Sequence, residues 1–490
     1  MTEHYDVVVI GAGTAGIPTA GFAARRGAKV LLIDAANRIG GTLHLSGGNM
    51  SAGGTRVQAA KGITDSPAQH YDDIMRISRG TADPAMVRLA VDNAPDTVHW
   101  LLDIGFEMLP EMPVINYGHE AYRVPRTYWG PEFGISVLKA IEPWLNTEIE
   151  AGRIELRLDT KLVGLQQDDS RQVTGAVIRG RDGVHRVVCG DNIVLTTGGY
   201  TANSALFPML NDGRPLYSLG DEYSQGEGIT IALGAGSYLR GGQMMLPTFG
   251  GVEDPHRPGY YLAGVVNLTP QYRQPWEIFV NLEGKRFVCE DTDSVDLRER
   301  ALLRQTDMRF WVIFDQAIKD AAPGILSDWP NNPYRDRELP PGKSIYDPAI
   351  DKHPDFSSAA TLTELANKTG IDREALERTV EAYNRGVADG QDPLGRKHHP
   401  LPIAKPPFYA IRNHGTSVKS YAGIAVDPEL RVLDRHDRPI ANLYAAGEAL
   451  GGGVMTGNSF CGGMSVTPAL TFGRLLGDRI LKWRRNIAAD

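Results

Sequence analysis

The chain has 490 residues, of which 42% are hydrophobic and 22% charged, so it can bury a large core and is long enough for two domains. Its formal net charge of -8 and its pI near 5.9 argue against the overall basic character that attracts nucleic acid or anionic lipid. The three cysteines (Cys189, Cys289 and Cys461) are far apart in sequence and form no CxxC pair, which argues against a disulfide framework, a zinc site and an iron–sulfur cluster.

The N-terminus leads directly into an expected strand. Met1 to Tyr5 leave no room for a charged segment followed by an apolar one, and no later apolar run approaches the length of a membrane span. We therefore expect a cytoplasmic protein without a membrane span.

The first expected elements form a strand, a glycine turn and a helix. The β-branched run from Tyr5 to Ile10 is typical of a buried parallel strand, and the sequence Gly-Ala-Gly-Thr-Ala-Gly follows it at 11–16. Gly11 permits the tight turn, Gly13 lets a pyrophosphate approach the backbone, and Gly16 lets the helix pack on the strand. This pattern predicts a dinucleotide site.

The next strand and the segment after it favour FAD over NAD. The expected strand Lys29 to Ile33 ends in Asp34, whose carboxylate lies at the spacing of about 20 residues expected for a ribose ligand. A second glycine-rich stretch at 38–54 would let the backbone pass close to a ribityl chain and an isoalloxazine ring. A nicotinamide cofactor has less need of such a stretch.

Helices and an aromatic loop are expected next. Tyr71 to Gly105 has helical spacings that Gly80, Pro84 and Pro95 should break into two or three helices. Residues 116–132 are rich in tyrosine, tryptophan and proline, which is typical of a loop that covers something.

Strands and an insertion follow. The segments 154–166 and 172–188 alternate like strands of a small antiparallel sheet, and 192–197 is a buried strand that returns to the nucleotide-binding sheet. From 243 to about 407 prolines, aromatics and charges increase, with one expected helix at 372–387. A strand at 442–446, a glycine-dense turn at 451–463 and a helix from near Ser465 close the chain.

These elements predict an α/β fold: a Rossmann-type FAD-binding domain formed by residues 1–242 and 408–490, with an inserted α+β substrate-capping domain at 243–407.

Several motifs together resemble one family. They include the glycine turn at 11–16, Thr197-Gly198-Gly199, residues 225–228, 243–248 and 284–290, Gly447-Glu448, and 462–473. The chain resembles the flavoprotein subunits of fumarate reductase and succinate dehydrogenase, and the 3-ketosteroid dehydrogenases that share their fold. The resemblance implies FAD as cofactor, with Glu448 near the ribityl chain and the start of the last helix directed at the flavin.

The expected cofactor-binding residues come from the two ends of the predicted FAD domain. They are Gly11, Gly13, Thr14, Ala15, Gly16, Asp34, Gly41, Thr42, Ser46, Gly48, Thr197, Gly198, Glu227, Gly447, Glu448, Gly463, Ser465 and Val466.

This chain differs from the fumarate reductases at several positions where those enzymes bind their substrate. Leu246 stands where those enzymes place a dicarboxylate-binding histidine, and Ser294 stands where their acid-donating arginine is expected. Arg298 or Arg300 could replace that arginine only after a local insertion. A further histidine and arginine are replaced around Met455 and Ser459. Two desolvated carboxylates need fixed cationic donors, so these losses argue against a small dianion.

The C-terminal stretch 456–473 looks most like the ketosteroid dehydrogenases, which exchange a hydride with the flavin and a proton beside a ketone. A ketone-polarising tyrosine of that group would fall at Ser459 or Phe460. Such chemistry needs a base and an oxyanion donor. The candidate catalytic residues are Tyr117, Tyr122, Tyr421 and Ser459, with His119 ranked lower, and any of these tyrosines could instead be a packing residue.

The sequence therefore predicts an FAD-dependent dehydrogenase that introduces a double bond next to a ketone in an apolar, cyclic or steroid-like substrate. An unidentified electron acceptor or donor would complete the cycle. Two alternatives remain open: a flavin-dependent ene-reductase of an activated alkene, and a non-redox flavin-containing isomerase or hydratase.

Overall fold

A computed structural model describes residues 3–218, 220–253, 268–323 and 350–487, with side chains to residue 481. The chain divides into two compact units, and the first contains Met1–Gly213, Gly220–Met245 and Lys419–Asp490. The second contains Arg214–Leu219 and Leu246–Val418. The domain boundaries expected from the sequence, at 242 and 407, stay a prediction.

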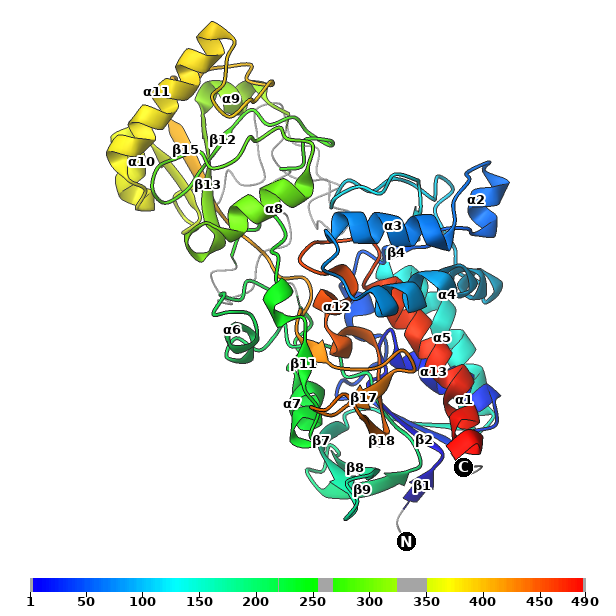
Figure 1. The fold of residues 1–490 in the computed structure, drawn as a ribbon. Helices are drawn as coiled ribbons and strands as arrows, with labels where there is room; N and C mark the ends of the chain where they lie inside the picture. The colour runs from blue at the N-terminus through cyan, green and yellow to red at the C-terminus, as the bar shows by residue number, and fades with distance from the viewer. Residues whose placement is uncertain (1–2, 219, 254–267, 324–349, 488–490) are drawn as a thin grey trace. The chain divides into compact units, whose positions relative to one another are not determined.

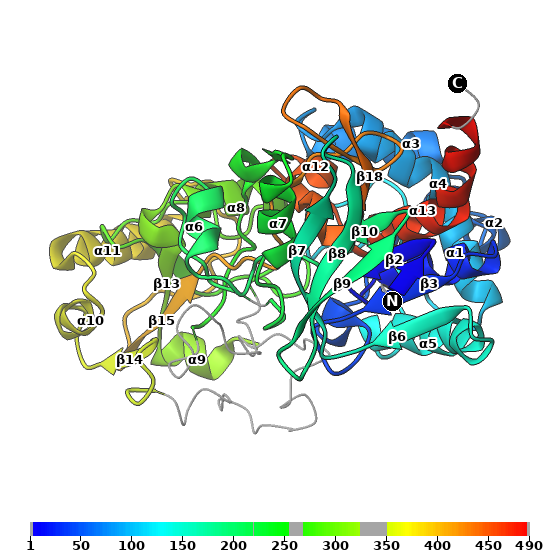
Figure 2. The same cartoon turned by 90° about the horizontal axis from the view of Figure 1, so that it is seen from below.

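The centre of the first unit is a six-stranded sheet in the order β17-β18-β10-β2-β3-β6 (Figure 2). Its strands are β2 (Val7–Ile10), β3 (Val30–Ile33), β6 (Ile154–Arg157), β10 (Ile193–Leu195), β17 (Arg431–Leu433) and β18 (Pro439–Ala445). All pairs are parallel except β17 with β18. Every residue of β2, β3 and β10 is buried, as their apolar runs predict. The predicted mixed α/β fold with a Rossmann-type sheet is thus confirmed.

The prediction for residues 154–166 was wrong in one respect. The segment is not one strand: its first part, β6, joins the sheet beside β3, and its second part, β7 (Lys161–Gln167), pairs in antiparallel fashion in a second, mixed sheet. The chain changes direction at Asp159, which has a positive φ of 50°, and the alternating pattern does not mark this turn. The second sheet has the order β1-β9-β8-β7, with β1 (Glu3–Tyr5), β8 (Val173–Arg179) and β9 (His185–Gly190).

Helices α1 (Gly16–Arg25) and α13 (Val466–Ile487) lie side by side in Figure 1. Two glycines of α13 permit this contact: a β-carbon on Gly473 would lie 2.2 Å from the Ala15 carbonyl oxygen, and one on Gly477 would lie 2.5 Å from that of Thr19. Helix α5 (Gly134–Glu150), which the sequence did not predict, packs on α1 as well. The helix expected from near Ser465 is confirmed as α13.

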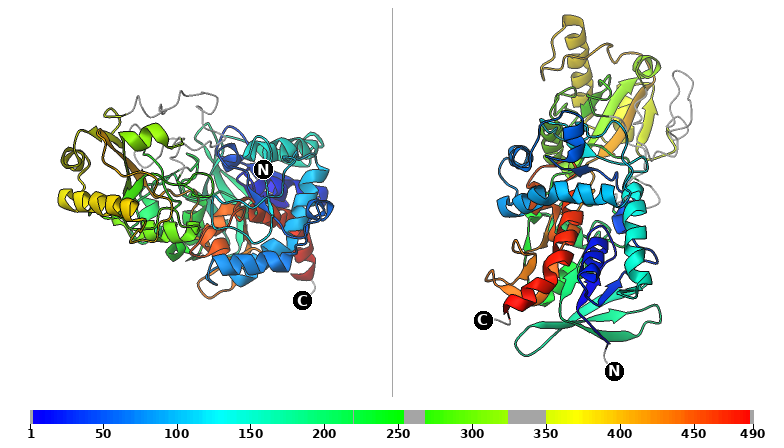
Figure 3. Two further views of the ribbon diagram at one scale, coloured as in Figure 1. Left: turned by 90° about the horizontal axis from the view of Figure 1, so that it is seen from above. Right: turned by 90° about the vertical axis from the view of Figure 1, so that its right-hand side faces the viewer.

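The segment 71–105 forms two helices, within the predicted two or three: α3 (Pro67–Ile77) and α4 (Pro84–Asp103), the latter packed on α13 (Figures 1 and 3). The predicted break at Pro95 was wrong, because α4 continues through it. Buried side chains lie on both sides of the proline, from Val91 to Leu101, so packing compensates the hydrogen bond that proline cannot donate.

Short elements complete the first unit. Two-stranded pairings join β4 (Met50–Ser51) to β5 (Thr127–Tyr128) and β11 (Leu239–Arg240) to β16 (Gly423–Ile424). The short helices are η1 (Gly41–His44), α2 (Arg56–Ala60), α6 (Leu206–Leu210), α7 (Glu227–Gly234), η2 (Gly242–Met244), η5 (Gly447–Leu450) and α12 (Gly452–Thr456). None of the helices in the described ranges is both long and apolar enough to cross a membrane.

The second unit is built on an antiparallel sheet in the order β12-β13-β15-β14. Its elements are β12 (Ile278–Val280), α8 (Val295–Leu303), η3 (Thr306–Met308), β13 (Arg309–Asp315), α9 (Gln316–Ala321), β14 (Phe356–Ala359), α10 (Leu362–Thr369), α11 (Arg373–Asp389) and β15 (Phe408–His414). The helix predicted at 372–387 is confirmed as α11, and the Asp372 carboxylate caps it by accepting the Ala375 N–H (2.8 Å).

Candidate active site

The glycine-rich loop between β2 and α1, residues 11–16, has no room for side chains at two positions. Gly11 has a φ of +109°, and a β-carbon on it would lie 2.3 Å from the Thr196 carbonyl oxygen. A β-carbon on Gly16 would lie 1.7 Å from the Gly11 carbonyl oxygen. Both glycines are therefore required for the close approach of turn, helix and strand.

Asp34, at the end of β3, is bound to this turn. One carboxylate oxygen accepts the Ala12 N–H (2.6 Å) and the other accepts the Ala36 N–H (2.8 Å). Burial raises the pKa of this carboxyl group, and the negative charge of Asp221 adds to the effect. A carboxylate offers about four lone pairs, so Asp34 can hold the turn and still accept hydrogen bonds from ribose hydroxyls.

The two glycine-rich loops lie against each other at Gly13 and Gly41, where a β-carbon on Gly41 would lie 3.3 Å from the Gly13 α-carbon. The nearest described atom to a β-carbon on Gly13 would be the α-carbon of Gly41, 3.9 Å away. At Gly198 the nearest would be Ser224 Oγ, also at 3.9 Å. Beside it, the buried Thr197 hydroxyl finds no hydrogen-bond partner among the described residues. Backbone that carries no side chains and an unsatisfied hydroxyl are what an FAD pyrophosphate and ribityl chain would use.

Other predicted cofactor residues are held in defined positions. Ser46 Oγ accepts the Gly48 N–H (3.0 Å), which fixes the second glycine-rich loop. Glu448 Oε1 accepts the Ser420 N–H (2.8 Å), and burial raises the pKa of Glu448. Their contact with FAD stays a prediction, as it does for Thr14, Ala15, Thr42, Gly447 and the glycines.

The start of α13 is hydrogen-bonded to strand β4 and lies close to it. The Ser51 N–H donates to Thr467 Oγ1 (2.8 Å), and a β-carbon on Gly463 would lie 2.5 Å from Ser51 N. Ser465 is exposed although its neighbours Met464 and Val466 are buried, so the helix start opens onto free space. The first helical N–H groups are suited to an anion or a polar ring edge there.

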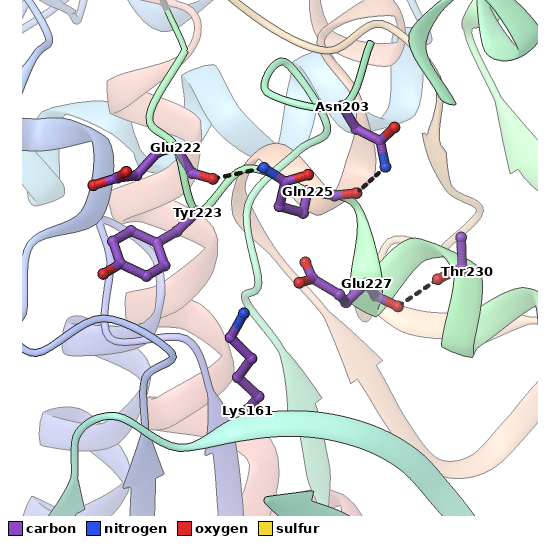
Figure 4. A pocket seen from close by; sticks show the side chains of 7 residues that line it. All are labelled: Lys161, Asn203, Glu222, Tyr223, Gln225, Glu227 and Thr230. Carbon is purple, nitrogen blue, oxygen red and sulfur yellow. Dashed lines mark hydrogen bonds between the residues drawn. The ribbon is translucent and has the colours of Figure 1, made fainter. Parts of the chain in front are cut away.

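A cavity of about 580 Å³ lies in the first unit between β7 and α7 (Figure 4). It is lined by Lys161, Asn203, Glu222, Tyr223, Gln225, Glu227 and Thr230. Of the predicted cofactor residues it contains Glu227, at the first position of α7. The cavity is near Asp34, because Thr160, the residue before Lys161, donates its N–H to the Asp34 carbonyl (2.8 Å).

The first part of the loop predicted at 116–132 packs on the end of the glycine-dense turn predicted at 451–463, whereas Thr127 and Tyr128 form strand β5. We call residues 116–123 the aromatic loop and residues 457–463 the glycine turn. Tyr122 Oη donates to the Gly462 carbonyl (2.6 Å), and Glu120 forms a parallel bridge with Cys461. Tyr122 is buried, and burial raises its pKa well above the ordinary value. Tyr122 therefore keeps its proton and holds loop and turn together.

Next to this contact, three side chains form a stack. The rings of His119 and Phe460 are parallel within 19°, with centroids 3.5 Å apart. Lys419 Nζ lies 4.2 Å from the Phe460 ring centroid, and it donates to Thr456 Oγ1 (2.7 Å). Burial lowers the pKa of His119 to about 3, and the charge of Lys419 contributes. His119 is therefore neutral at pH 7.

The other catalytic candidates differ in exposure. Tyr421 is 1% exposed and its ring centroid lies 5.1 Å from Lys419 Nζ. Ser459 is fully buried within the glycine turn, whereas Tyr117, in the aromatic loop, is 37% exposed. Thus Tyr122, Tyr421 and Ser459 are buried, and Tyr117 is partly exposed.

Ser294 and several charged residues of the second unit have structural contacts. Ser294, at the position of the expected arginine, caps α8 by accepting the Leu297 N–H (3.2 Å). Arg298 is buried and donates to the Leu268 carbonyl, and Arg286 pairs with Glu290 and Asp392. None of the three cysteines forms a disulfide, and no cluster of potential metal ligands occurs in the described part of the chain.

Two features of the region were not predicted. Lys419 directly precedes the Ser-Tyr-Ala-Gly motif, but an isolated lysine gives no sequence signal for burial. Arg126 is fully buried, where Nη2 binds Asp65 Oδ1 (2.8 Å) and Nη1 binds Asp73 Oδ2 (3.0 Å). A carboxylate more than 50 residues away in sequence cannot be paired with its arginine from spacing alone.

Comparison with known proteins gives consistent results. A family model described as an FAD binding domain matches residues 6–465. The chain is 30% identical over 488 residues to the fumarate reductase (cytochrome) of Shewanella frigidimarina, covering 99% of this chain and 78% of that protein. It is 25% identical over 560 residues to the 4-oxocyclohexanecarboxylate 2-dehydrogenase of Sinomonas cyclohexanicum, covering 97% and 92%.

Among solved structures, 3-ketosteroid delta1-dehydrogenase from Sterolibacterium denitrificans has a TM-score of 0.75 at 21% identity, covering 98% of this chain and all of that one. This likeness concerns the fold.

Proposed function

Because the chain belongs to the FAD binding domain family and is an FAD-dependent oxidoreductase acting on CH–CH groups, we propose that it dehydrogenates a CH–CH bond next to a ketone. The substrate is an apolar, cyclic compound. The observation that carries this proposal is the buried aromatic region made by the aromatic loop, the glycine turn and Tyr421, because it offers hydroxyl groups within apolar surroundings.

FAD, when bound, accepts a hydride from one carbon of the bond. The backbone at Gly13, Gly41 and Gly198 would hold its extended part, and Asp34 and Glu448 would accept hydrogen bonds from its hydroxyls. The family match supports this assignment, and the individual contacts are part of the proposal.

The protein must also remove a proton from the carbon next to the ketone. We assign the removal of this proton to Tyr421, which is buried and lies beside the Lys419 ammonium. Ser459 and the N–H groups of the glycine turn would donate hydrogen bonds to the ketone oxygen, where negative charge develops. Tyr122 is assigned a positioning role because its hydroxyl is engaged by the Gly462 carbonyl. Tyr117 is the alternative proton acceptor.

The reverse reaction, reduction of an activated alkene, is the second candidate. It is favoured by the similarity to a fumarate reductase at 30% identity, whereas the similarity to a 2-dehydrogenase favours the forward direction. The electron partner would set the direction. A non-redox isomerase or hydratase would turn over without an electron acceptor, which separates it from both.

Anaerobic mixing of the purified holoenzyme with saturated cyclic ketones, 3-ketosteroids and succinate tests the proposal. Loss of oxidised-flavin absorbance with a cyclic ketone is the expected result and identifies the substrate class. Loss with succinate alone would contradict the argument from Leu246 and Ser294. If no saturated compound bleaches the flavin but an unsaturated ketone reoxidises the chemically reduced enzyme, the reductase direction is correct.

A further inference from the structure

Phe133, the residue immediately before α5, has a strained backbone. Its φ of 57° and ψ of -126° lie in a region that residues with a β-carbon rarely adopt, and this conformation is costly for a bulky side chain. A glycine could take the same conformation without this cost. The aromatic side chain must therefore contribute something that offsets the strain.

Hydrogen bonds on both sides fix this conformation. The Phe133 N–H donates to the Gly130 carbonyl (3.1 Å), and the Phe133 carbonyl accepts the Ser136 N–H (3.1 Å). Ser136 Oγ in turn accepts the Glu132 N–H (2.8 Å). The surrounding turn therefore holds Phe133 in the strained conformation, an arrangement that is most common at ligand sites.

The start of α5 lies along the second glycine-rich loop, residues 38–54. The Gly134 N–H donates to the Ser46 carbonyl (3.0 Å), and a β-carbon on Gly134 would lie 2.2 Å from the Leu43 carbonyl oxygen. A β-carbon on Gly48 would lie 2.4 Å from the Phe133 carbonyl carbon. The backbone of Phe133 is therefore packed directly against a loop that we assign to the cofactor.

The protein itself does not bury Phe133 completely. This residue is partly exposed, whereas Gly134, Val137 and Leu138 in the first turns of α5 are buried. A partly exposed ring gains less from burial than a phenylalanine of the core, so packing within the protein is a weak reason to keep a strained phenylalanine here. A ligand that covers the ring would supply the missing contact.

We propose that the ring of Phe133 packs against the isoalloxazine of bound FAD, so that Phe133 is a cofactor-binding residue. The isoalloxazine is an extended aromatic system, and contact with a phenylalanine ring provides both apolar burial and ring–ring attraction. The inference rests on the proposed contact between FAD and the second glycine-rich loop. It does not depend on the identity of the substrate or on the direction of the reaction.

The test measures the release of FAD from the holoenzyme. Each variant is diluted in steps, and free FAD is determined at equilibrium from its fluorescence. In F133A, which keeps the β-carbon and loses the ring, we expect FAD to bind about ten- to a hundredfold more weakly, which corresponds to the loss of one aromatic side-chain contact. F133Y keeps an aromatic ring and should retain most of the affinity.

Two further measurements separate the ring contact from a loss of stability. The visible circular dichroism of bound flavin depends on its direct surroundings, so it should change in F133A and be restored in F133Y. F133G removes the ring and the strain together, so at saturating FAD it should unfold at a higher urea concentration than F133A. If F133A does not fold, F133G decides. M209A is the control, because Met209 is 79% exposed in the first unit and its loss should leave FAD affinity unchanged.

Wild-type FAD affinity in F133A or F133G would overturn the inference. An equal loss of affinity in F133A and F133Y with unchanged circular dichroism of the flavin would overturn it as well, because the turn and not the ring would then be responsible. Both outcomes leave the proposed function intact if a cyclic ketone still bleaches the wild-type flavin. Conversely, weaker FAD binding in F133A that F133Y restores, without a response of the wild type to any ketone, would support the role of Phe133 and refute the dehydrogenase assignment.

Discussion

Replacing Tyr122 with phenylalanine separates a positioning tyrosine from a catalytic one. The substitution removes a 2.6 Å hydrogen bond and leaves the Gly462 carbonyl without this donor in a buried place. The expected loss in the free energy of unfolding is about 1–3 kcal/mol, the usual cost of leaving one buried polar group unsatisfied. The ring of Tyr122 is retained, so its packing should change little.

Because burial raises the pKa of Tyr122 well above its ordinary value, we expect no role for it as a proton acceptor at neutral pH. The turnover number of Y122F, normalised to bound FAD, should stay within about tenfold of the wild type, since general acid–base groups typically contribute 10²–10⁴-fold. The pH profile of kcat should keep its shape.

The assay is urea denaturation of the holoenzyme together with steady-state turnover on the ketone found by anaerobic mixing. Tyr272, whose ring is 58% exposed, gives the control variant Y272F, for which we expect a change within about 0.5 kcal/mol. A decrease of turnover by more than about a hundredfold in Y122F, with full FAD content and the expected modest destabilisation, would refute the positioning role and make Tyr122 the proton-transfer group.

Three further substitutions test the scaffold. R126M should destabilise the protein by about 3–5 kcal/mol in urea unfolding, because it removes the arginine that binds the buried Asp65 carboxylate, whereas Asp73 keeps its ion pair with Arg76; a change below about 1 kcal/mol would show that Asp65 is neutralised otherwise. G11A should yield protein with little bound flavin, measured as the ratio of flavin to protein absorbance, since the new methyl group would lie 2.3 Å from the Thr196 carbonyl oxygen; normal flavin content would contradict the tight-turn role. Burial lowers the pKa of His414 to about 3, so this histidine is neutral in the folded protein while the unfolded chain takes up a proton below about pH 6.5. Its contribution to stability therefore falls as the pH decreases from about 6.5 towards 3, by up to about 1.4 kcal/mol per pH unit, and H414Q should flatten the pH dependence of urea unfolding; an unchanged slope would refute this origin.

The nucleotide-binding part of the fold could be predicted because its signals are local. The buried runs at β2, β3 and β10, together with the glycine-rich loop at 11–16, have patterns that few other structures produce. The split at Asp159 and the continuation of α4 through Pro95 could not be predicted, because each depends on packing against distant segments.

The candidate site was predicted in its parts and not in its arrangement. The aromatic loop and the glycine turn were both identified, but their contact through Tyr122 and Gly462 joins residues 340 positions apart. Lys419 was overlooked because a single lysine in a sequence is most often at the surface, and its burial follows only from the tertiary neighbours Thr456 and Phe460.

The order of strands in the parallel sheet determines when the protein can fold during synthesis. Strand β10 pairs with β2 on one side and with β18 on the other, so the sheet joins residues 7–10, 193–195 and 439–445. All of the second unit, which ends at Val418, leaves the ribosome before β18 does. The N-terminal unit of a chain usually folds first during synthesis. Here that order is reversed, because the unit that contains the N-terminus can fold only after nearly the whole chain has been synthesised. Until then the exposed edge of β10 must be protected, and a released chain truncated shortly before residue 439 should contain a folded second unit and an incomplete cofactor-binding sheet.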